Sequence, residues 1–588
     1  MVERKGYTID NFYQGGYSTF KPLGTRDYFG VGKLGETTDP RNANILQEVA
    51  SKLNSGVKNI EIEMVSPEVF DSIPKQQLKE VNRLAKLTGI DISVHGPVVD
   101  TAGFTQQGFS ETDREIAERK IFQSIERVHE INPKGNIPVN FHSAEGIPGS
   151  QFLPPGQRKD SQYAKMIAVE RETGRLVPLQ KDEKYYPRDK VEKETIFPEE
   201  NLRIANTSKW DNDTSQMIFN QERAVELLQK DRPLIEHLMN DLNSGNITPE
   251  TIQKFPEQQK AWKNVLLAKS YLDDIHKQIN GIFSRAYEYG SEKQKKALQQ
   301  ISKNFGEQLN KNPENIFAQA SAMQDLILNL KNPALAPEMH VPIEKFAVEQ
   351  SSKTFGNAAF DAYKKFKDNT PTVVIENPPA GFALSTAEDL KNLVVESRKK
   401  FVERAVKEGI GEGEAQRQAN KLIGATWDVG HINMWRKYGY KEKDIIKEAE
   451  KIAPFVKHVH LSDNFGFEHT ELPMGMGNVP IKEVMAKLGE KGFEAKKIIE
   501  AGQWWQNFKT SPFQSTLEGM GVPVYSSRVA PYWNQAPGFQ QDYFGGYGMM
   551  LPQTNYEIFG AGFSQLPSEL GGQKPGAAGS RMSGRPME

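Results

Sequence analysis

Short runs of β-branched residues recur along this chain, and most are followed by a stretch in which apolar residues repeat with helical period. This alternation is typical of βαβ units, in which crossover helices join parallel strands. Eight runs have the length and composition of a buried strand, at residues 28–31, 59–64, 90–95, 138–142, 372–377, 425–428, 456–461 and 497–501. Eight strand–helix units close a TIM barrel, so we predict an α/β fold built on a (β/α)8 barrel.

The stretches between these runs predict the barrel helices and one large insertion. Helical periodicity is clearest at residues 111–131, 387–407, 442–452 and 481–489. The segment between the fourth and fifth runs is too long for an ordinary loop, so we predict a separate subdomain after the fourth strand. We expect it to contain a hairpin that turns at Thr173 and Gly174, followed by a mainly helical part over 216–330.

These patterns define the predicted domains. Residues 1–148 and 341–522 form the two halves of the barrel, and residues 149–340 form the insertion. Residues 523–588 are rich in Gly, Pro and aromatic residues, which predicts an irregular C-terminal tail with a disordered end. We expect the insertion or the tail to contact a protein partner, whose identity the sequence does not give.

Composition narrows the chemistry that the chain can perform. It has 588 residues, a formal net charge of -2 and no cysteine. With so little net charge, any contact with nucleic acid must come from a local basic patch. Without cysteine there are no disulfides, zinc fingers or thiol nucleophile, so His, Asp and Glu must hold any metal. The sequence has neither an apolar signal segment nor a membrane-spanning apolar run, which predicts a cytoplasmic protein without membrane contact.

Residue types that bind metal ions stand at the ends of six successive predicted strands. The carboxyl ends of the strands of a parallel barrel meet on one face, where their side chains share a pocket. Buried charges are costly unless they are paired or bind a metal, so core packing does not explain such a set. We therefore predict a metal centre at the top of the barrel, formed by His95, His142, Glu376, Asp428, His431, His460, His469, Glu471 and Glu500.

The local sequences around these residues resemble the xylose-isomerase-like barrel superfamily. Examples are VHGP at His95, VVIENPP at Glu376, WDVGH from Asp428 to His431, and EHTELPMGMG around His469. Within the superfamily they are most similar to endonuclease IV, because the Asp-x-x-His spacing of Asp428 and His431 favours the endonuclease over the sugar isomerases. The resemblance covers residues 26–148 and 340–520 and leaves the insertion and the tail outside it.

This resemblance implies up to three divalent metal ions, with zinc as the expected metal. His95 and His142 would hold the first ion, with Glu376 as a bridge to the second. The second ion would be held by the set that the superfamily's sugar isomerases and epimerases use for their single metal, which here is Glu376, Asp428, His460 and Glu500. An isomerase would use manganese or magnesium at that set.

The sequence departs from the endonuclease pattern in two places. The third ion is completed in that family by an Asp-x-His pair before a Gly-x-Gly turn. Here His469 and Glu471 stand in those places, with carboxylate and imidazole exchanged, and would bind the ion together with His431. Val98 replaces the Tyr that the endonuclease uses against DNA, which weakens the DNA-substrate interpretation but leaves the metal ligands intact.

The sequence is compatible with three functions. The first is a phosphodiester hydrolase of the abasic-site endonuclease type, acting on damaged DNA or a related phosphate ester, with Glu500 orienting the attacking water. The second is a sugar or sugar-phosphate isomerase or epimerase with one metal, in which Glu376 and Glu500 shuttle protons at adjacent carbons. The third is a non-catalytic barrel that displays the insertion. The three histidines beyond the single-metal set, His95, His142 and His431, favour hydrolysis.

Overall fold

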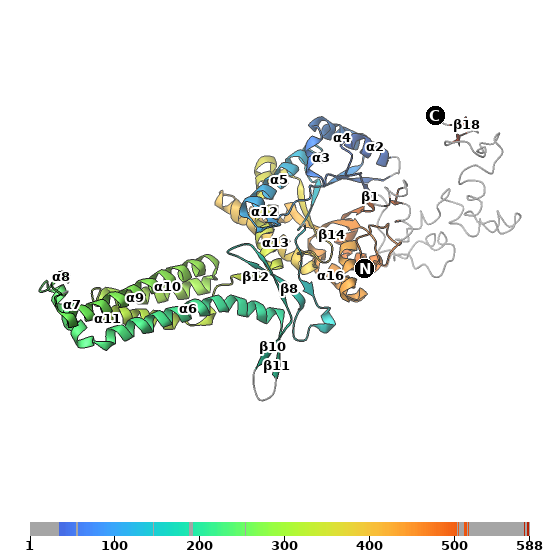
Figure 1. Ribbon diagram of the computed structural model, residues 1–588. Coiled ribbons are helices and arrows are strands. Elements are labelled where there is room, and N and C mark those ends of the chain that lie inside the picture. The colour runs from blue at the N-terminus through green and yellow to red at the C-terminus, as the bar shows by residue number, and fades with distance from the viewer. Residues whose placement is uncertain are drawn as a thin grey trace. The chain divides into compact units, whose positions relative to one another are not determined.

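Eight predominantly buried parallel strands close into a barrel, and helices cover its outside (Figure 1). The computed structural model describes residues 34–53, 57–144, 146–186, 192–252, 254–502, 504, 511–513, 516, 581–582 and 585–586. Side chains fill the barrel and helices cover it, so most strand residues are buried on both faces and the strand sequences are largely apolar. The (β/α)8 barrel predicted from the sequence is confirmed.

The strand order around the barrel is β1–β16–β15–β14–β13–β6–β3–β2, and β2 pairs with β1 to close it. Seven of the eight strands overlap the predicted runs, within two residues at each end. Their bounds, with those of the first strand, are β1 Leu34–Thr37, β2 Asn59–Glu63, β3 Asp91–His95, β6 Pro138–His142, β13 Thr372–Glu376, β14 Ile423–Asp428, β15 Val456–Leu461 and β16 Lys496–Ile499.

The first strand is where the sequence prediction was wrong. Residues 28–31 lie outside the described residues, and β1 closes the barrel instead through pairs with β16 and β2. A Cβ on Gly35 would lie 2.4 Å from the carbonyl oxygen of Asn59 on β2, so only glycine allows the two strands to approach this closely. The same glycine removes the β-branched signal by which the other strands were found.

The helices of the barrel unit follow the predicted pattern. Helices α13 and α16 have the predicted bounds, α5 ends two residues early, and α17 continues past a non-helical Gly489. The set is α2 Ile45–Leu53, α3 Pro67–Ser72, α4 Lys75–Thr88, α5 Glu111–His129, α12 Ile343–Phe366, α13 Ala387–Lys407, α14 Glu412–Leu422, α15 Val429–Asn433, α16 Glu442–Ile452 and α17 Ile481–Glu494. Short strands complete it at β4 Phe104–Thr105, β5 Gly108–Phe109 and β7 Gln151–Phe152.

The chain divides into two compact units, and the second unit, Arg158–Ile343, comprises most of the insertion. Its strands β8 and β9 form the predicted hairpin, with Gly174 at a positive φ of 71° in the turn. The bounds in this unit are β8 Tyr163–Glu170, β9 Leu176–Gln180, β10 Asp182–Tyr186, β11 Glu192–Ile196, β12 His340–Pro342, α6 Pro198–Lys230, α7 Arg232–Asn243, α8 Pro249–Ile252, α9 Pro256–Tyr289, α10 Glu292–Lys311 and α11 Ile316–Leu330.

The helical part of the insertion begins earlier than expected, because α6 starts at Pro198 instead of near residue 216. Proline at the first helical position and two glutamates in the first turn are helix-start signals. The stretch that follows is rich in Asn, Thr and Ser, which have low helix propensity. The sequence pattern therefore did not predict a helix here despite its start signals. Trp210 and Met217 are buried in the core of the helical bundle, so tertiary packing stabilises this part of the helix.

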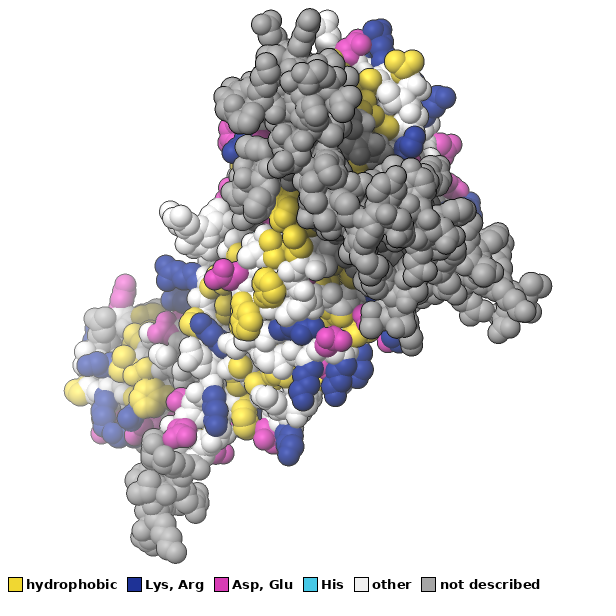
Figure 2. Space-filling view, turned by 90° about the vertical axis from the view of Figure 1, so that its right-hand side faces the viewer, with side chains coloured by type: hydrophobic (Ala, Val, Ile, Leu, Met, Phe, Trp, Pro, Cys, Tyr) yellow, Lys and Arg dark blue, Asp and Glu magenta, His cyan; other side chains and the backbone are white. Residues whose placement is uncertain are grey.

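The described surface carries charges of both signs. On the face in Figure 2, Lys and Arg side chains are mixed with Asp, Glu and hydrophobic side chains, consistent with the net charge of -2. None of the helices among the described residues is long and apolar enough to cross a membrane. The predicted tail, 523–588, lies almost entirely outside the described residues, apart from the strand pair β17 Arg581–Met582 and β18 Arg585–Pro586.

A buried carboxyl at the start of α12 predicts a pH-dependent stability. Glu344 is 6% exposed and accepts hydrogen bonds from the backbone N–H and hydroxyl of Ser150, at 2.6 and 3.0 Å. Burial, and next the charge of Asp389, raise the pKa of Glu344 from 4.5 to about 7. The stabilisation from the protonated carboxyl is therefore complete below pH 4.5 and is lost as the pH rises through about 7.

We expect Glu344→Gln to gain stability relative to the wild type as the pH rises from about 5 to about 8, because the amide cannot ionise. The gain is on the order of 3 kcal/mol, from a pKa difference of about 2.5 units. Thermal unfolding of both proteins across this pH range measures it. A difference in melting temperature that does not change with pH would contradict the prediction.

Candidate metal centre

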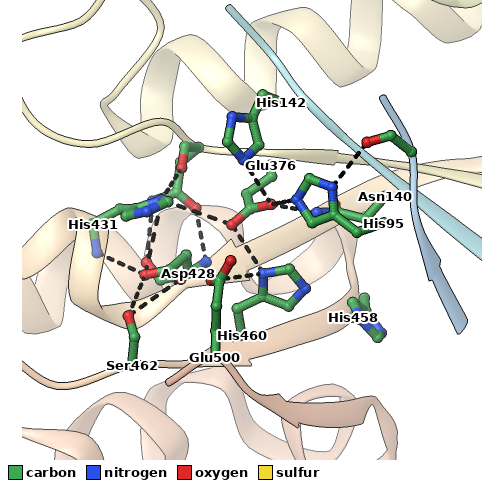
Figure 3. A network of polar contacts seen from close by, with 12 residues as sticks. His95, Asn140, His142, Glu376, Asp428, His431, His458, His460, Ser462 and Glu500 are labelled. Atoms are coloured by element: carbon green, nitrogen blue, oxygen red, sulfur yellow. Dashed lines mark hydrogen bonds and ion pairs between the residues drawn. The ribbon is translucent and has the colours of Figure 1, made fainter. Parts of the chain in front are cut away.

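The strand register places the predicted ligands side by side. His95, His142, Glu376 and Asp428 are the last residues of β3, β6, β13 and β14, and His460 is the second-last residue of β15. Glu376 pairs with His142 across β13 and β6, and Asp428 pairs with His460 across β14 and β15. Glu500 directly follows β16, and its backbone N–H donates to Leu461 at 3.0 Å. The barrel therefore brings these side chains to one end (Figure 3).

Glu376 lies at the centre of the cluster, fully buried, with histidines on both sides of its carboxylate (Figure 3). Its Oε2 is 3.4 Å from Nε2 of His95 and 3.7 Å from Nε2 of His142, and accepts a hydrogen bond from Asn140. Its Oε1 is 3.0 Å from Nδ1 of His460. Burial alone would raise the pKa of Glu376, but the charge of His460 and its hydrogen-bond contact, with His95 and His142 nearby, hold it well below its ordinary value.

Two of the histidines have a defined proton position. Nδ1 of His95 is 3.0 Å from the carbonyl oxygen of Gly96, and Nδ1 of His431 is 2.7 Å from that of Asn377. A carbonyl oxygen only accepts hydrogen bonds, so each Nδ1 carries a proton, and in the neutral ring Nε2 keeps its lone pair. Metal-binding histidines are oriented in this way by backbone carbonyls. Nε2 of His95 has no hydrogen-bond partner among the described residues.

Acidic groups crowd the other side of Glu376. Atoms of Glu376, Asp428, His431 and Glu500 lie within 4.8 Å of one another. Ser462 donates to both oxygens of Asp428, at 3.2 and 3.3 Å. Burial, and then the charges of Glu500 and Glu376, raise the pKa of Asp428 well above its ordinary value. A divalent cation between these carboxylates would remove the repulsion that otherwise favours a proton on one of them.

His469 and Glu471, the pair in which imidazole and carboxylate are exchanged, lie on the loop that follows β15. Nε2 of His469 is 2.8 Å from Nε2 of His431 and 3.7 Å from Oε1 of Glu471. His431 can only accept at Nε2, so His469 donates in this contact. Glu471 has a positive φ of 44°, a conformation that L-residues rarely adopt and that is concentrated at functional sites. The structure thus brings His431, His469 and Glu471 together, although the last two are partly exposed.

Asp463 holds this loop in place. Its buried carboxylate accepts the backbone N–H groups of Asn464, Gly475, Gly477 and Val479, at 2.8 to 3.0 Å. A Cβ on Gly477 would lie 2.3 Å from Oδ1 of Asp463, so glycine is required for this close approach. The Gly-x-Gly turn is therefore fixed relative to the end of β15, and with it the segment that carries His469 and Glu471.

Sequence reasoning missed four polar residues of the barrel interior. Asn140 donates to Glu376, and Glu61 contacts both His458 and His460. Glu63, the last residue of β2, lies near His95, and burial raises its pKa to about 8. The available signal was the alternation of a β-strand: Glu61 and Glu63, and likewise His458 and His460, are two residues apart and share a face.

The donor set fits a divalent metal centre. All the candidate ligand atoms are imidazole nitrogens or carboxylate oxygens, which suit zinc and, where carboxylates dominate, manganese or magnesium. Glu376 belongs both to a group with His95 and His142 and to the group with Asp428, His431 and Glu500. Oε2 of Glu500 and Nε2 of His95 form no hydrogen bond among the described residues, and each has only an ion-pair contact, with His460 at 3.2 Å and with Glu376 at 3.4 Å. Such buried groups are costly unless a ligand satisfies them.

Comparison with known proteins shows what this chain is similar to. Residues 414–514, which include β14, β15 and β16, match a family model described as xylose isomerase-like TIM barrel. An 81-residue stretch is 32% identical to an uncharacterised protein of Methanocaldococcus jannaschii, covering 14% of this chain and 26%, about a quarter, of that relative. The crystal structure of a D-tagatose 3-epimerase-like protein aligns over 84% of this chain and 99% of its own, with 12% identity and a TM-score of 0.36.

The family match and the observed topology agree with each other. The matched segment contains three adjacent strands of the closed barrel and the candidate ligands Asp428, His431, His460 and Glu500. The remaining strands complete the same eight-stranded parallel barrel, with an insertion after β6. Residues 414–514 of this closed eight-stranded barrel are therefore similar to the family described as xylose isomerase-like TIM barrel.

Proposed function

We propose that this protein is a metal-dependent hydrolase of phosphate esters, with a centre of up to three divalent ions, most suitably zinc. One observation carries the proposal: the Glu376 carboxylate has His95 and His142 at one oxygen and His460 at the other. With imidazole nitrogens at both of its oxygens, this carboxylate would be placed to hold an ion on each side. A single-metal isomerase does not need His95 and His142 as metal ligands.

Each candidate ligand then has a role. His95 and His142 would hold one ion together with Glu376, and Glu376, Asp428, His460 and Glu500 would hold a second. His431, through the lone pair of its Nε2, would hold a third ion with His469 and Glu471. Ions held here would act as Lewis acids on a phosphate ester and on the attacking water. Glu500, whose side chain is 15% exposed, stands where it can orient that water.

The substrate in this proposal is a phosphodiester, with damaged DNA as the first candidate. Metal analysis of the purified protein, combined with cleavage assays on DNA that contains an abasic site, tests it. We expect close to three ions per chain and cleavage that a chelator abolishes. A protein that carries no divalent ion after metal loading, or three ions with no activity on any phosphate ester, would overturn the proposal.

Sugar isomerisation is the second candidate, and one observation favours it. Glu376, Asp428, His460 and Glu500, the set that the resemblance assigns to a single metal, lie together at the ends of four successive strands. Glu376 and Glu500 would then move protons at adjacent substrate carbons. One ion per chain, together with exchange of substrate carbon-bound hydrogen with solvent deuterium, would favour isomerisation over hydrolysis.

His469 and Glu471 give a prediction that is specific to the third ion. We expect His469→Ala and Glu471→Ala each to lower the metal content by about one ion per chain, because each removes a ligand from an ion that has few. Metal analysis of the two variants beside the wild type measures this. Unchanged stoichiometry in both would instead make the loop a substrate contact.

A further inference from the structure

Beneath the ligands, a second group of side chains crosses the barrel interior. His458 and His460 are two residues apart on β15 and share its inward face, and Glu61 lies on β2. β1 and β16 separate β2 from β15 in the barrel, so the contact between them runs through the interior. All three side chains are fully buried. A carboxylate in such a place must be compensated by its neighbours.

The contacts of Glu61 are specific. Its Oε2 accepts a hydrogen bond from Nε2 of His458 at 2.8 Å, and its Oε1 lies 2.8 Å from Nε2 of His460. The contact between Oε1 of Glu61 and Nε2 of His460 is an ion pair, and neither atom has a hydrogen-bond partner among the described residues. Nδ1 of His460 faces the opposite way, 3.0 Å from Oε1 of Glu376 and 3.2 Å from Oε2 of Glu500 (Figure 3).

We propose that Glu61 is a positioning residue that keeps the proton of His460 on Nε2 and so presents the lone pair of Nδ1 to the metal centre. The inference rests on the proposed function. Carboxylates face both ring nitrogens, but Glu376 and Glu500, which face Nδ1, would hold the same ion as His460, whereas Glu61 is left to accept the remaining ring hydrogen on Nε2. It also makes the ligand nitrogen more basic, as outer carboxylates do at other metal-bound histidines. His458 holds the second oxygen of Glu61 and stops the carboxylate from turning away.

The same three residues do not fit a separate metal site. Both oxygens of Glu61 already lie at hydrogen-bond distance from imidazole nitrogens. An ion between Glu61 and His460 would require His460 to give both ring nitrogens to metals and lose both protons. Nδ1 of His460 faces Glu376 and Glu500 in the candidate metal centre. If Nδ1 binds a metal there, Nε2 keeps the ring hydrogen.

The test is the zinc affinity of Glu61→Gln, measured by competition with a chelator. We expect a loss of about 10- to 100-fold, the usual effect of removing an outer partner of a metal ligand. Glu344→Gln is the matched control, because it replaces another buried carboxyl group of the barrel unit, whose hydrogen bonds are with Ser150. It should bind zinc as the wild type does.

A second pair of variants covers the case in which Glu61→Gln does not fold. His458→Gln keeps a donor toward Glu61 and should bind zinc nearly as tightly as the wild type, whereas His458→Leu should bind it several-fold more weakly. Wild-type affinity in Glu61→Gln, or equal affinities in the two His458 variants, would overturn the inference alone. A wild-type protein that binds no divalent ion would overturn the proposed function and this inference together.

Discussion

Replacing Glu376 by Gln is expected to remove most of the bound metal and nearly all activity. Glu376 is fully buried and lies between His95 and His142 on one side and His460 on the other. In the proposed centre each of its oxygens would help to hold a different ion. A glutamine keeps the shape but offers one neutral oxygen, so two ions lose an anionic ligand at once. The loss of zinc affinity should exceed the roughly 10- to 100-fold expected for an outer partner.

Metal analysis and chelator competition on Glu376→Gln measure the effect, with Glu344→Gln as the control for a buried carboxyl outside the cluster. A chelator-sensitive activity should disappear with the metal. If Glu376→Gln retained the full metal content, Glu376 would not be the bridge. The hydrolase proposal would then lose the observation that supports it, and the single-metal alternative would also be excluded, because it needs the same ligand.

The sequence predicted most of the barrel and the candidate ligands for a physical reason. Barrel strands are buried on both faces, so their apolar runs stand out, and a polar residue at the end of such a run is conspicuous. His95, His142, Glu376 and Asp428 each end a strand in this way. The first strand did not stand out, since Gly35 is needed for close packing against Asn59 and interrupts the apolar pattern.

The interior contacts could not be predicted from local sequence. Glu61 and His458 are 397 positions apart in the sequence. The resemblance to endonuclease IV does not assign a metal-ligand role to either of them. A polar residue inside a strand is compatible with many neighbours, and only the barrel topology shows that β2 faces β15 across the interior. The proton positions of His95 and His431 likewise depend on backbone carbonyls whose directions the sequence does not give.

Asp463→Asn is expected to destabilise the barrel unit and to disturb the loop that carries His469 and Glu471. The Asp463 side chain is 1% exposed and accepts four backbone N–H groups, from Asn464, Gly475, Gly477 and Val479. An asparagine has the same shape, but its amide nitrogen cannot accept. Two of the four N–H groups would then face a donor, which costs about 1–3 kcal/mol each for a buried group. The expected loss of unfolding free energy is therefore about 2–6 kcal/mol.

Chemical denaturation measures this loss, and Asp444→Asn is the matched control. Asp444 is a buried aspartate of α16 that accepts the backbone N–H of Lys441, at the surface end of a helix and away from the cluster. Its replacement should cost less than that of Asp463 and leave the metal content unchanged. In Asp463→Asn the ion proposed at His431, His469 and Glu471 should be lost first. The ion proposed at His95, His142 and Glu376 should stay bound. Full metal content in Asp463→Asn, with equal destabilisation in both variants, would mean that the loop keeps its place without this carboxylate.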